Sequence, residues 1–315
     1  MCVIETLHDG PPDLRDRPFT TQQALDCGLT SFHLARAVDA GWLRRPARGL
    51  YVPATLADSL ETRVRTLELC LPDDAFLTDH TAAWLLAGDR ALVPGDHLAV
   101  PAISCFRPSA AGRLRRGEVR SGERDVRDGD LMVVGGLRVT TPLRTALDIG
   151  RLARNNDVRL HGMDTMLSLG RFTRDELVIE VGRFKGQRGV IGLRALAPLA
   201  DGGSESFGES ALRLRWHQAH LPLPTTQHQV SGTPYRLDLA LPADLFSAEY
   251  DGEAFHSAPD QTARDAARRR DLHRLGWHIE PCRRDTVFGR SATVEHRLRA
   301  AYDLVVSSRR RRRYF

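Results

Sequence analysis

Residues 235–252 read YRLDLALPADLFSAEYDG and carry two acidic side chains, Asp238 and Glu249, in consecutive segments with the composition of β-strands. Successive side chains of a strand point to opposite faces, so Asp238 faces away from the leucines on either side of it. By the same rule Glu249 and Asp251 share one face. If the two strands are neighbours in a sheet, three carboxylates meet at one end of it.

Such a cluster needs compensation, because carboxylates a few ångströms apart repel one another and raise one another's pKa. A divalent cation supplies it, and hard oxygen ligands favour Mg²⁺ or Mn²⁺. Phosphodiester hydrolysis uses such a cation to activate water and to neutralise the scissile phosphate. His256 could then act as general base or proton relay, and Glu209, on a preceding helix, could add a ligand or orient the water.

A single acidic residue in a strand usually faces solvent, and a single histidine after a turn is usually structural. Two acids on consecutive strands, a third acid before Gly252 and a histidine four residues later form a joint pattern that chance produces much less often. We therefore interpret the cluster as functional.

The segments around these strands predict one domain, with helices and strands in an order that suits a mixed sheet flanked by helices. The expected helices are 205–220, 260–275 and 293–306, and the expected strands are 226–230, 235–241, 245–250 and 277–281.

This C-terminal region resembles the endonuclease-like domains related to very-short-patch (Vsr-like) repair endonucleases of the PD-(D/E)XK superfamily. The motifs that carry the resemblance are Gly208-Glu209-Ser210, Arg236-Leu237-Asp238-Leu239, Glu249-Tyr250-Asp251-Gly252 with His256, Asp265 with Arg268-Arg269, and Gly276-Trp277. The resemblance implies a restriction-endonuclease-like fold that hydrolyses DNA to 5′-phosphate ends. It also implies that Asp238 and Glu249 bind the metal and that the remaining site residues surround them: Glu209, Asp251, His256, Asp265 near the site, and Arg268 towards phosphate.

One departure from the superfamily pattern concerns its usual lysine after the second acid, which is Asp251 here. Lys185 is the only lysine in the chain and lies far from this motif in sequence. Either His256 or an arginine (Arg264 or Arg268) takes that part, or activity is weak or absent. Arginine holds its proton too tightly to be a base, so it could only stabilise charge.

Residues 19–53 have the order helix, turn, helix and basic hairpin, which is typical of a winged helix-turn-helix. Thr20-Thr21 is expected to cap the first helix and Ser31 the second, which runs to Ala40. Residues 42–43 and 49–52 are expected strands, joined by a basic segment at 44–48. The predicted DNA contacts are Ser31, His33 and Arg36 on the second helix and a phosphate-binding wing of Arg44, Arg45 and Arg48.

This N-terminal segment resembles the winged helix of AbiEi-type antitoxins of abortive-infection systems, which are transcriptional autorepressors. Residues 137–142 and 144–148 (LRVTTP and RTALD) extend the resemblance into the middle of the chain. The resemblance implies binding to DNA.

The whole chain has 315 residues and a formal net charge of +5, which permits nucleic-acid binding without requiring it. Its five cysteines are scattered and form no CxxC, which argues against a disulfide framework or a zinc site and fits a reducing cytoplasm. No apolar run reaches the length of a membrane span, and the first residues do not have the pattern of a signal peptide. We expect a cytoplasmic protein without membrane contact.

The sequence thus predicts an α+β, α/β multidomain protein. Its expected parts are a winged helix-turn-helix (1–56), a mixed α/β, antitoxin-like middle region (57–203), an endonuclease domain (204–306) and a basic tail (307–315). The predicted function is that of an Mg²⁺-dependent deoxyribonuclease acting in defence or DNA repair. The alternatives are a transcriptional regulator or antitoxin with a catalytically inert nuclease fold and, third, a toxin with RNase activity. A homodimer and a toxin or defence-system partner remain open beside DNA.

Overall fold

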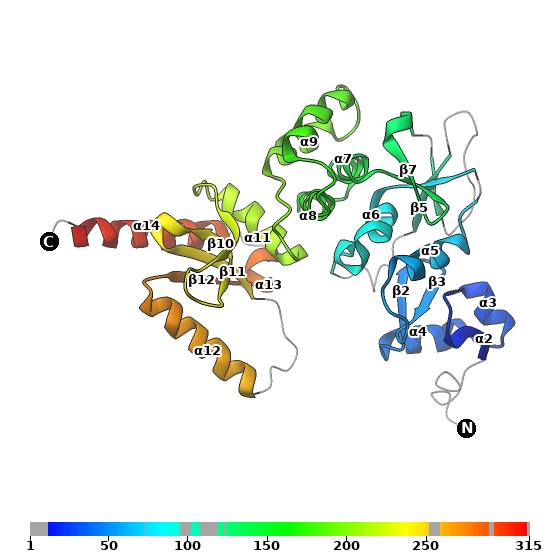
Figure 1. The fold of residues 1–315 in the computed structure, drawn as a ribbon, viewed down its shortest axis with the longest axis horizontal. Coiled ribbons are helices and arrows are strands. Elements are labelled where there is room, and N and C mark those ends of the chain that lie inside the picture. Colours follow the sequence, from blue (N-terminus) through cyan, green and yellow to red (C-terminus); the bar gives the residue numbers. More distant parts are fainter. Residues whose placement is uncertain are drawn as a thin grey trace.

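The computed structural model describes residues 12–72, 74–94, 102–107, 119–122, 124–251, 259–289 and 293–313. These residues form a mixed α/β protein with three separate sheets, one for each successive part of the chain (Figure 1). Within these ranges no disulfide joins the cysteines. No described helix combines the length and the apolar character that crossing a lipid bilayer requires.

The N-terminal region packs three helices against a small sheet of order β1-β3-β2. Its elements are α2 (Pro12–Arg15), β1 (Phe19–Thr20), α3 (Thr21–Asp26), α4 (Ser31–Asp39), β2 (Leu43–Ala47) and β3 (Leu50–Pro53). Leu34 and Ala37 of α4 are buried in the core of this region together with Phe19 and Ala24. Gly28, with φ of +84°, makes the tight turn between α3 and α4, a backbone conformation that glycine adopts without strain.

Two expectations for this region were wrong in detail. Thr30, not Ser31, is the N-cap of α4, and its hydroxyl accepts the His33 N–H. The basic segment expected to join two strands is itself strand β2. Pro46 cannot donate to a sheet, but β2 is an edge strand with a register shift between Arg44 and Ala47, and an edge tolerates a proline.

The middle region begins with a five-stranded sheet of order β6-β5-β4-β8-β7. Its strands are β4 (Phe76–Leu77), β5 (Ile103–Phe106), β6 (Val119–Arg120), β7 (Leu131–Val134) and β8 (Leu137–Thr140), and its first helices are α5 (Leu60–Glu68) and α6 (Asp79–Ala87). The sequence His97-Leu98-Ala99-Val100 also predicts a strand, but these residues lie outside the described ranges. Helices α7 (Pro142–Leu152), α8 (Asn156–Leu167), α9 (Arg174–Glu180) and α10 (Val190–Leu196) follow.

The junctions between the three regions are packed. Ala47 and Leu50 of the N-terminal hairpin are buried in the same apolar cluster as the five-stranded sheet. On the other side, Leu214 joins the apolar cluster of the middle helices, although it belongs to the first helix of the C-terminal region. The N-terminal region and the C-terminal region therefore both pack against the middle region.

The C-terminal region is a four-stranded sheet of order β12-β11-β10-β9 with helices around it. Its elements are α11 (Phe207–Gln218), β9 (Thr225–Gln229), β10 (Arg236–Leu241), β11 (Phe246–Asp251), α12 (Pro259–Arg274), β12 (His278–Arg283), α13 (Arg284–Phe288) and α14 (Thr293–Arg313). β12 is parallel to β11, and the other pairs are antiparallel, so the sheet is mixed as expected.

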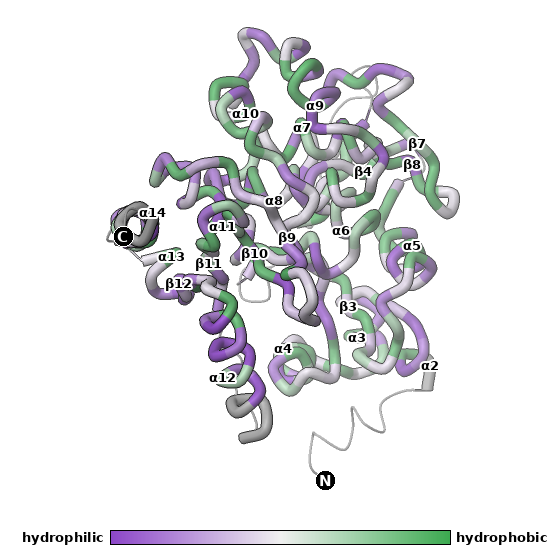
Figure 2. The backbone as a smooth tube through the Cα atoms, turned by 60° about the vertical axis from the view of Figure 1, so that its left-hand side comes forward, coloured by the Kyte–Doolittle hydropathy of each residue, from purple (hydrophilic) through white to green (hydrophobic). Residues whose placement is uncertain are grey.

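Helix α14 does not end at Val306, and residues 307–313 are not a separate tail. The helix continues to Arg313 because arginine is a good helix former and no proline or glycine interrupts the run. In Figure 1 this helix extends away from the sheet, and Figure 2 shows α12 as hydrophilic along much of its described length.

A buried ion pair fastens α11 to α8 across the second junction. Arg213 of α11 is 2% exposed and donates to Asp164 of α8, which is completely buried. Arg213 also donates to the Leu199 carbonyl and the Ser204 hydroxyl, and Asp164 accepts the Asp201 N–H. These contacts fix residues 199–204, although the sequence of residues 201–204 (DGGS) predicts a linker.

Replacing Asp164 with alanine leaves the Arg213 charge buried without its carboxylate, and we expect this to lower the free energy of unfolding by about 3–5 kcal/mol. The Glu61→Ala variant is the control, because Glu61 belongs to an exposed pair with Arg65 and its loss should cost less than about 1 kcal/mol. Urea denaturation of both variants measures the difference. Equal stability of the two variants would contradict this role for the buried pair.

Candidate functional site

Helix α4 presents a solvent-exposed face next to its buried one. Ser31 and Arg36 are exposed, and His33 is half-buried, with its Nδ1 accepting the Thr30 N–H at 3.3 Å. Phe32, which the sequence prediction missed, is 63% exposed on the same helix, with the Arg36 guanidinium 5.9 Å from its ring centroid. An exposed phenylalanine beside an arginine suits contact with a base methyl group and a phosphate.

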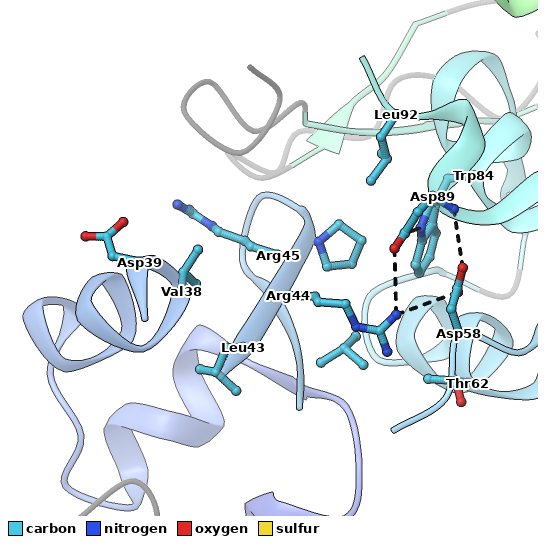
Figure 3. Close-up of a pocket in the computed structure, with 12 residues that line it drawn as sticks. Val38, Asp39, Leu43, Arg44, Arg45, Asp58, Thr62, Trp84, Asp89 and Leu92 are labelled. Carbon is cyan, nitrogen blue, oxygen red and sulfur yellow. Dashed lines mark hydrogen bonds and ion pairs between the residues drawn. The ribbon is translucent and has the colours of Figure 1, made fainter. Parts of the chain in front are cut away.

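The three arginines predicted as a wing lie in different surroundings. Arg48 is exposed in the turn between β2 and β3. Arg45 extends over the Tyr51 ring, 5.5 Å from its centroid. Arg44 points to the middle region, as Figure 3 shows, where it donates to the Leu56 carbonyl at 2.7 Å and lies 4.0 and 3.8 Å from Asp58 and Asp89. Arg44 thus helps to hold the N-terminal region in place.

A cavity of about 510 Å³ surrounds this contact. Its wall is mostly apolar, with Val38 and Leu43 from the N-terminal region and Trp84 and Leu92 from the middle region (Figure 3). Trp84 also donates from its indole nitrogen to Asp89 at 3.2 Å. The ion pairs of Arg44 therefore connect the two regions across a space that side chains only partly fill.

In the C-terminal sheet, the strand register brings Asp238 and Glu249 together. β10 and β11 pair Leu239 with Ala248, so the next positions along the ladder are Asp238 and Glu249. Both line a cavity of about 300 Å³. Asp251 of β11 and Asp265 of α12 line it too, so four of the six predicted catalytic residues share one cavity. His256 lies outside the described residues.

Glu209 approaches this cluster from α11 but is engaged in the start of its own helix. Its carboxylate accepts the Glu205 N–H, the Ser206 hydroxyl and the Gln227 amide at 2.8–2.9 Å. Gln227, which the sequence prediction missed, has φ of +50°, a strained conformation of the kind that accumulates at functional sites.

Gly208 allows α11 to lie this close to the sheet. A Cβ atom at Gly208 would come within 2.0 Å of the Tyr250 ring, so any larger residue would push the helix away from β11. Packing therefore explains why a glycine directly precedes Glu209. The glycine lets α11 contact Tyr250, and the next residue then places its carboxylate near Asp238.

Arg268 of α12 occupies the other side of the cluster. Its Nη1 donates to Glu249 Oε2 at 2.8 Å, its Nη2 donates to Glu249 Oε1, and Nη2 also donates to the Arg236 carbonyl at 2.8 Å. This is a bidentate pair, the strongest arrangement of guanidinium and carboxylate. Arg268, predicted to contact DNA, thus binds Glu249 inside the protein, while Asp251 lies 3.6 Å from Arg283.

Asp238 is the most strongly perturbed acid of the cluster. Its pKa is raised from 3.8 to about 7, chiefly by burial and also by the carboxylates of Glu209 and Glu249, while the Tyr250 N–H and Arg268 act in the opposite direction. The Tyr250 N–H donates to Asp238 Oδ2 at 2.9 Å. Asp238 is therefore close to half-protonated near neutral pH, as expected for a carboxyl that shares a site with like charges.

The oxygen donors of this cavity match the ligands that Mg²⁺ or Mn²⁺ prefers. Among the described residues, however, no three acidic, histidine or cysteine side chains are placed to hold a metal ion. Both oxygens of Glu249 accept hydrogen bonds from Arg268, so a cation at Asp238 and Glu249 would compete with Arg268 for this carboxylate. In the described geometry the Arg268 guanidinium supplies the positive charge beside Glu249.

The raised pKa of Asp238 predicts a pH-dependent contribution to stability. The folded state holds this proton more tightly than the unfolded state, so the stabilisation is complete below about pH 4 and is lost as pH rises through 7. Between pH 5 and pH 8 the protein should lose on the order of 2 kcal/mol relative to its Asp238→Asn variant, whose side chain carries no charge. Urea unfolding at both pH values measures this, and a constant difference between the two proteins refutes the perturbation.

Comparison with known proteins identifies the N-terminal region. Residues 14–54, from α2 to the end of β3, match the family model described as "Transcriptional regulator, AbiEi antitoxin". The match covers the two helices and the hairpin described above and extends no further along the chain.

Two curated relatives cover most of the chain. They are "Uncharacterized protein MT2308" of Mycobacterium tuberculosis (strain CDC 1551 / Oshkosh) and "Uncharacterized protein Rv2248" of Mycobacterium tuberculosis (strain ATCC 25618 / H37Rv). Each is 31% identical over 256 residues, which is 80% of this chain and 90% of the relative. The chain therefore belongs to the family of these mycobacterial proteins, and its residues 14–54 are similar to the AbiEi antitoxin family of transcriptional regulators.

Proposed function

We propose that this protein is a DNA-binding transcriptional regulator of the antitoxin class. The observation that carries the proposal is the match of residues 14–54 to AbiEi antitoxin regulators, in a segment whose second helix is exposed along one face. The order of α3, α4 and the β2–β3 hairpin supports the reading of this region as a winged helix-turn-helix, in which the second helix enters the major groove. Ser31, Phe32 and Arg36 are then the residues that meet the bases and the adjacent phosphates.

The electrostatics of the region support the same proposal. Arg36 and Arg48 are exposed, and no carboxylate is recorded as their partner among the described residues. Each can therefore bind a phosphate without first breaking an ion pair. Arg44, by contrast, is held by Asp58 and Asp89, so within the predicted wing Arg48 is better placed than Arg44 to bind the DNA backbone.

The Arg36→Ala and Arg48→Ala variants should each weaken binding to DNA from upstream of the protein's own gene. A lost phosphate contact should also reduce the slope of log affinity against log salt by about 1. Fluorescence anisotropy at several salt concentrations measures both quantities. Arg171→Ala is the matched control, since Arg171 is also exposed but lies in the middle region.

The proposal fails if the intact protein does not bind this DNA more tightly than unrelated DNA. It also fails if Arg171→Ala weakens binding as much as the two N-terminal variants, because the positive charge would then act without a defined face.

A second candidate function, metal-dependent cleavage of DNA, is favoured by one observation. Asp238, Glu249, Asp251 and Asp265 line one cavity, as a phosphodiesterase of the restriction-endonuclease type would need. In this proposal Asp238 and Glu249 bind Mg²⁺ after Arg268 has released Glu249, and Arg268 is then available to stabilise phosphate charge. In the regulator proposal the same region is inert, and Arg268 keeps Glu249 neutralised permanently.

Nicking of supercoiled plasmid DNA with Mg²⁺ or Mn²⁺ separates the two roles of the C-terminal region. If it is a nuclease, Asp238→Asn and Glu249→Gln should each reduce nicking at least about a hundredfold, while DNA binding stays within about twofold. If it is inert, the intact protein and both variants should leave the plasmid supercoiled. Equal nicking by all three proteins would indicate a contaminating nuclease and refute the cleavage proposal.

A further inference from the structure

A cavity of about 280 Å³ in the middle region is walled mainly by positive charge. It lies where α7 meets the segment 124–130 and the segment 183–188, away from α4 and from the carboxylate cavity of the C-terminal sheet. Among the residues that the structure describes, one acidic residue, Asp125, lines it. Six arginines line it as well: Arg124, Arg127, Arg144, Arg151, Arg183 and Arg188.

The deepest of these arginines are held by a carboxylate that does not line the cavity. Asp148 is completely buried and accepts hydrogen bonds from Arg124 at 3.1 Å, Arg144 at 2.9 Å and Arg151 at 3.3 Å. Asp130 is shared in the same way between Arg144 and Arg183. Asp79 also pairs with Arg124, and Glu180 with Arg183, so four carboxylates match these four arginines. Among the described residues that line the cavity, the positive charge left over is that of Arg127 and Arg188 against Asp125.

Arg151 carries a hydrogen-bond donor that this network does not satisfy. It is only 9% exposed, and its Nε is buried without a hydrogen-bond partner. Burial, together with the neighbouring charges of Arg124 and Arg144, lowers its pKa, although Asp148 acts in the opposite direction. A buried donor that the protein leaves unsatisfied costs free energy, so the hydrogen-bonding capacity of Arg151 is not fully used within the protein.

The arginines are also held rigidly. The guanidinium groups of Arg144, Arg151 and Arg183 lie 5.5, 4.5 and 5.7 Å from the centroid of the Phe184 ring. Gln187 accepts from Arg151 Nη1 at 3.0 Å, which ties the segment 183–188 to α7. Donors fixed in place before binding lose little entropy when a ligand arrives.

A purely structural network would explain the buried pairs between arginine and aspartate. It would not explain an open cavity at their centre or the exposed Arg127 and Arg188 that line it. Planar guanidinium forks match the oxygens of a phosphate, and several arginines can bind one phosphate from different directions.

We propose that this cavity binds the phosphate group of a small phosphorylated ligand. Arg151 and the other buried arginines contact the phosphate oxygens at the base. Arg127 and Arg188 complete the neutralisation of the dianion at the mouth, where the rest of the ligand extends into solvent.

Isothermal titration calorimetry of the full chain tests the proposal, with inorganic phosphate and a nucleoside 5′-monophosphate as probes, each compared with chloride at equal ionic strength. We expect saturable binding of one phosphate per chain. Arg127→Gln and Arg188→Gln should each weaken it about tenfold, since each removes a charge-assisted contact. Both residues are exposed, so the melting temperature without phosphate should not change. Arg194→Gln, an exposed arginine outside the cavity, is the matched control and should bind phosphate normally.

Three outcomes would overturn the proposal. The first is the absence of any phosphate-specific heat at millimolar concentrations of both probes. The second is binding that neither cavity variant weakens, because the anion would then lie elsewhere. The third is tight binding of a 5′-phosphorylated oligonucleotide, dependent on Arg188, with no binding of the small probes, since the ligand would then be a nucleic-acid end.

Discussion

The completely buried carboxylate of Asp148 is the contact on which the middle region depends. It accepts hydrogen bonds from three arginines in two separate segments of the chain. Arg124 and Arg144 also pair with Asp79 and Asp130, whereas Arg151 has no other carboxylate partner among the described residues and would become an uncompensated buried charge. The middle region in turn shares one apolar cluster with the N-terminal hairpin and another with α11. The positions of helix α4 and of the C-terminal cavity therefore both depend on a correctly paired middle region.

The two candidate sites differ in the rearrangement that each needs before it can bind its ligand. The face of α4 needs no rearrangement to meet DNA, because Arg36 and Phe32 are already exposed. The carboxylate cavity has its central acid bound by Arg268 and a second acid, Asp238, that holds a proton near neutral pH. This contrast, together with the family of residues 14–54, is why regulation is the primary proposal and cleavage the second.

The helices and strands of the C-terminal region were predicted closely from the sequence, as was the proximity of Asp238 and Glu249. Both predictions rest on local properties, namely the alternation of side chains along a strand and the order of consecutive strands. It could not predict that Arg268 would bind Glu249, since that depends on the position of α12 beside the sheet. Strand β2 was missed because Arg44, Arg45 and Pro46 have the composition of a loop, and only the edge position of the strand makes the proline acceptable. The arginine cavity was also missed. Its members come from three segments, and the RTALD motif (144–148) showed two of the charges but not their arrangement.

Footprinting of the full-length protein on DNA from upstream of its own gene tests the central claim most directly. An exposed α4 inserted into the major groove should protect a discrete stretch of about one helical turn, or two such stretches if two copies bind, and Arg36→Ala should abolish the protection at the same protein concentration. Uniform protection along the whole fragment, or none at concentrations at which the protein is bound, would contradict the assignment of a sequence-reading helix to α4.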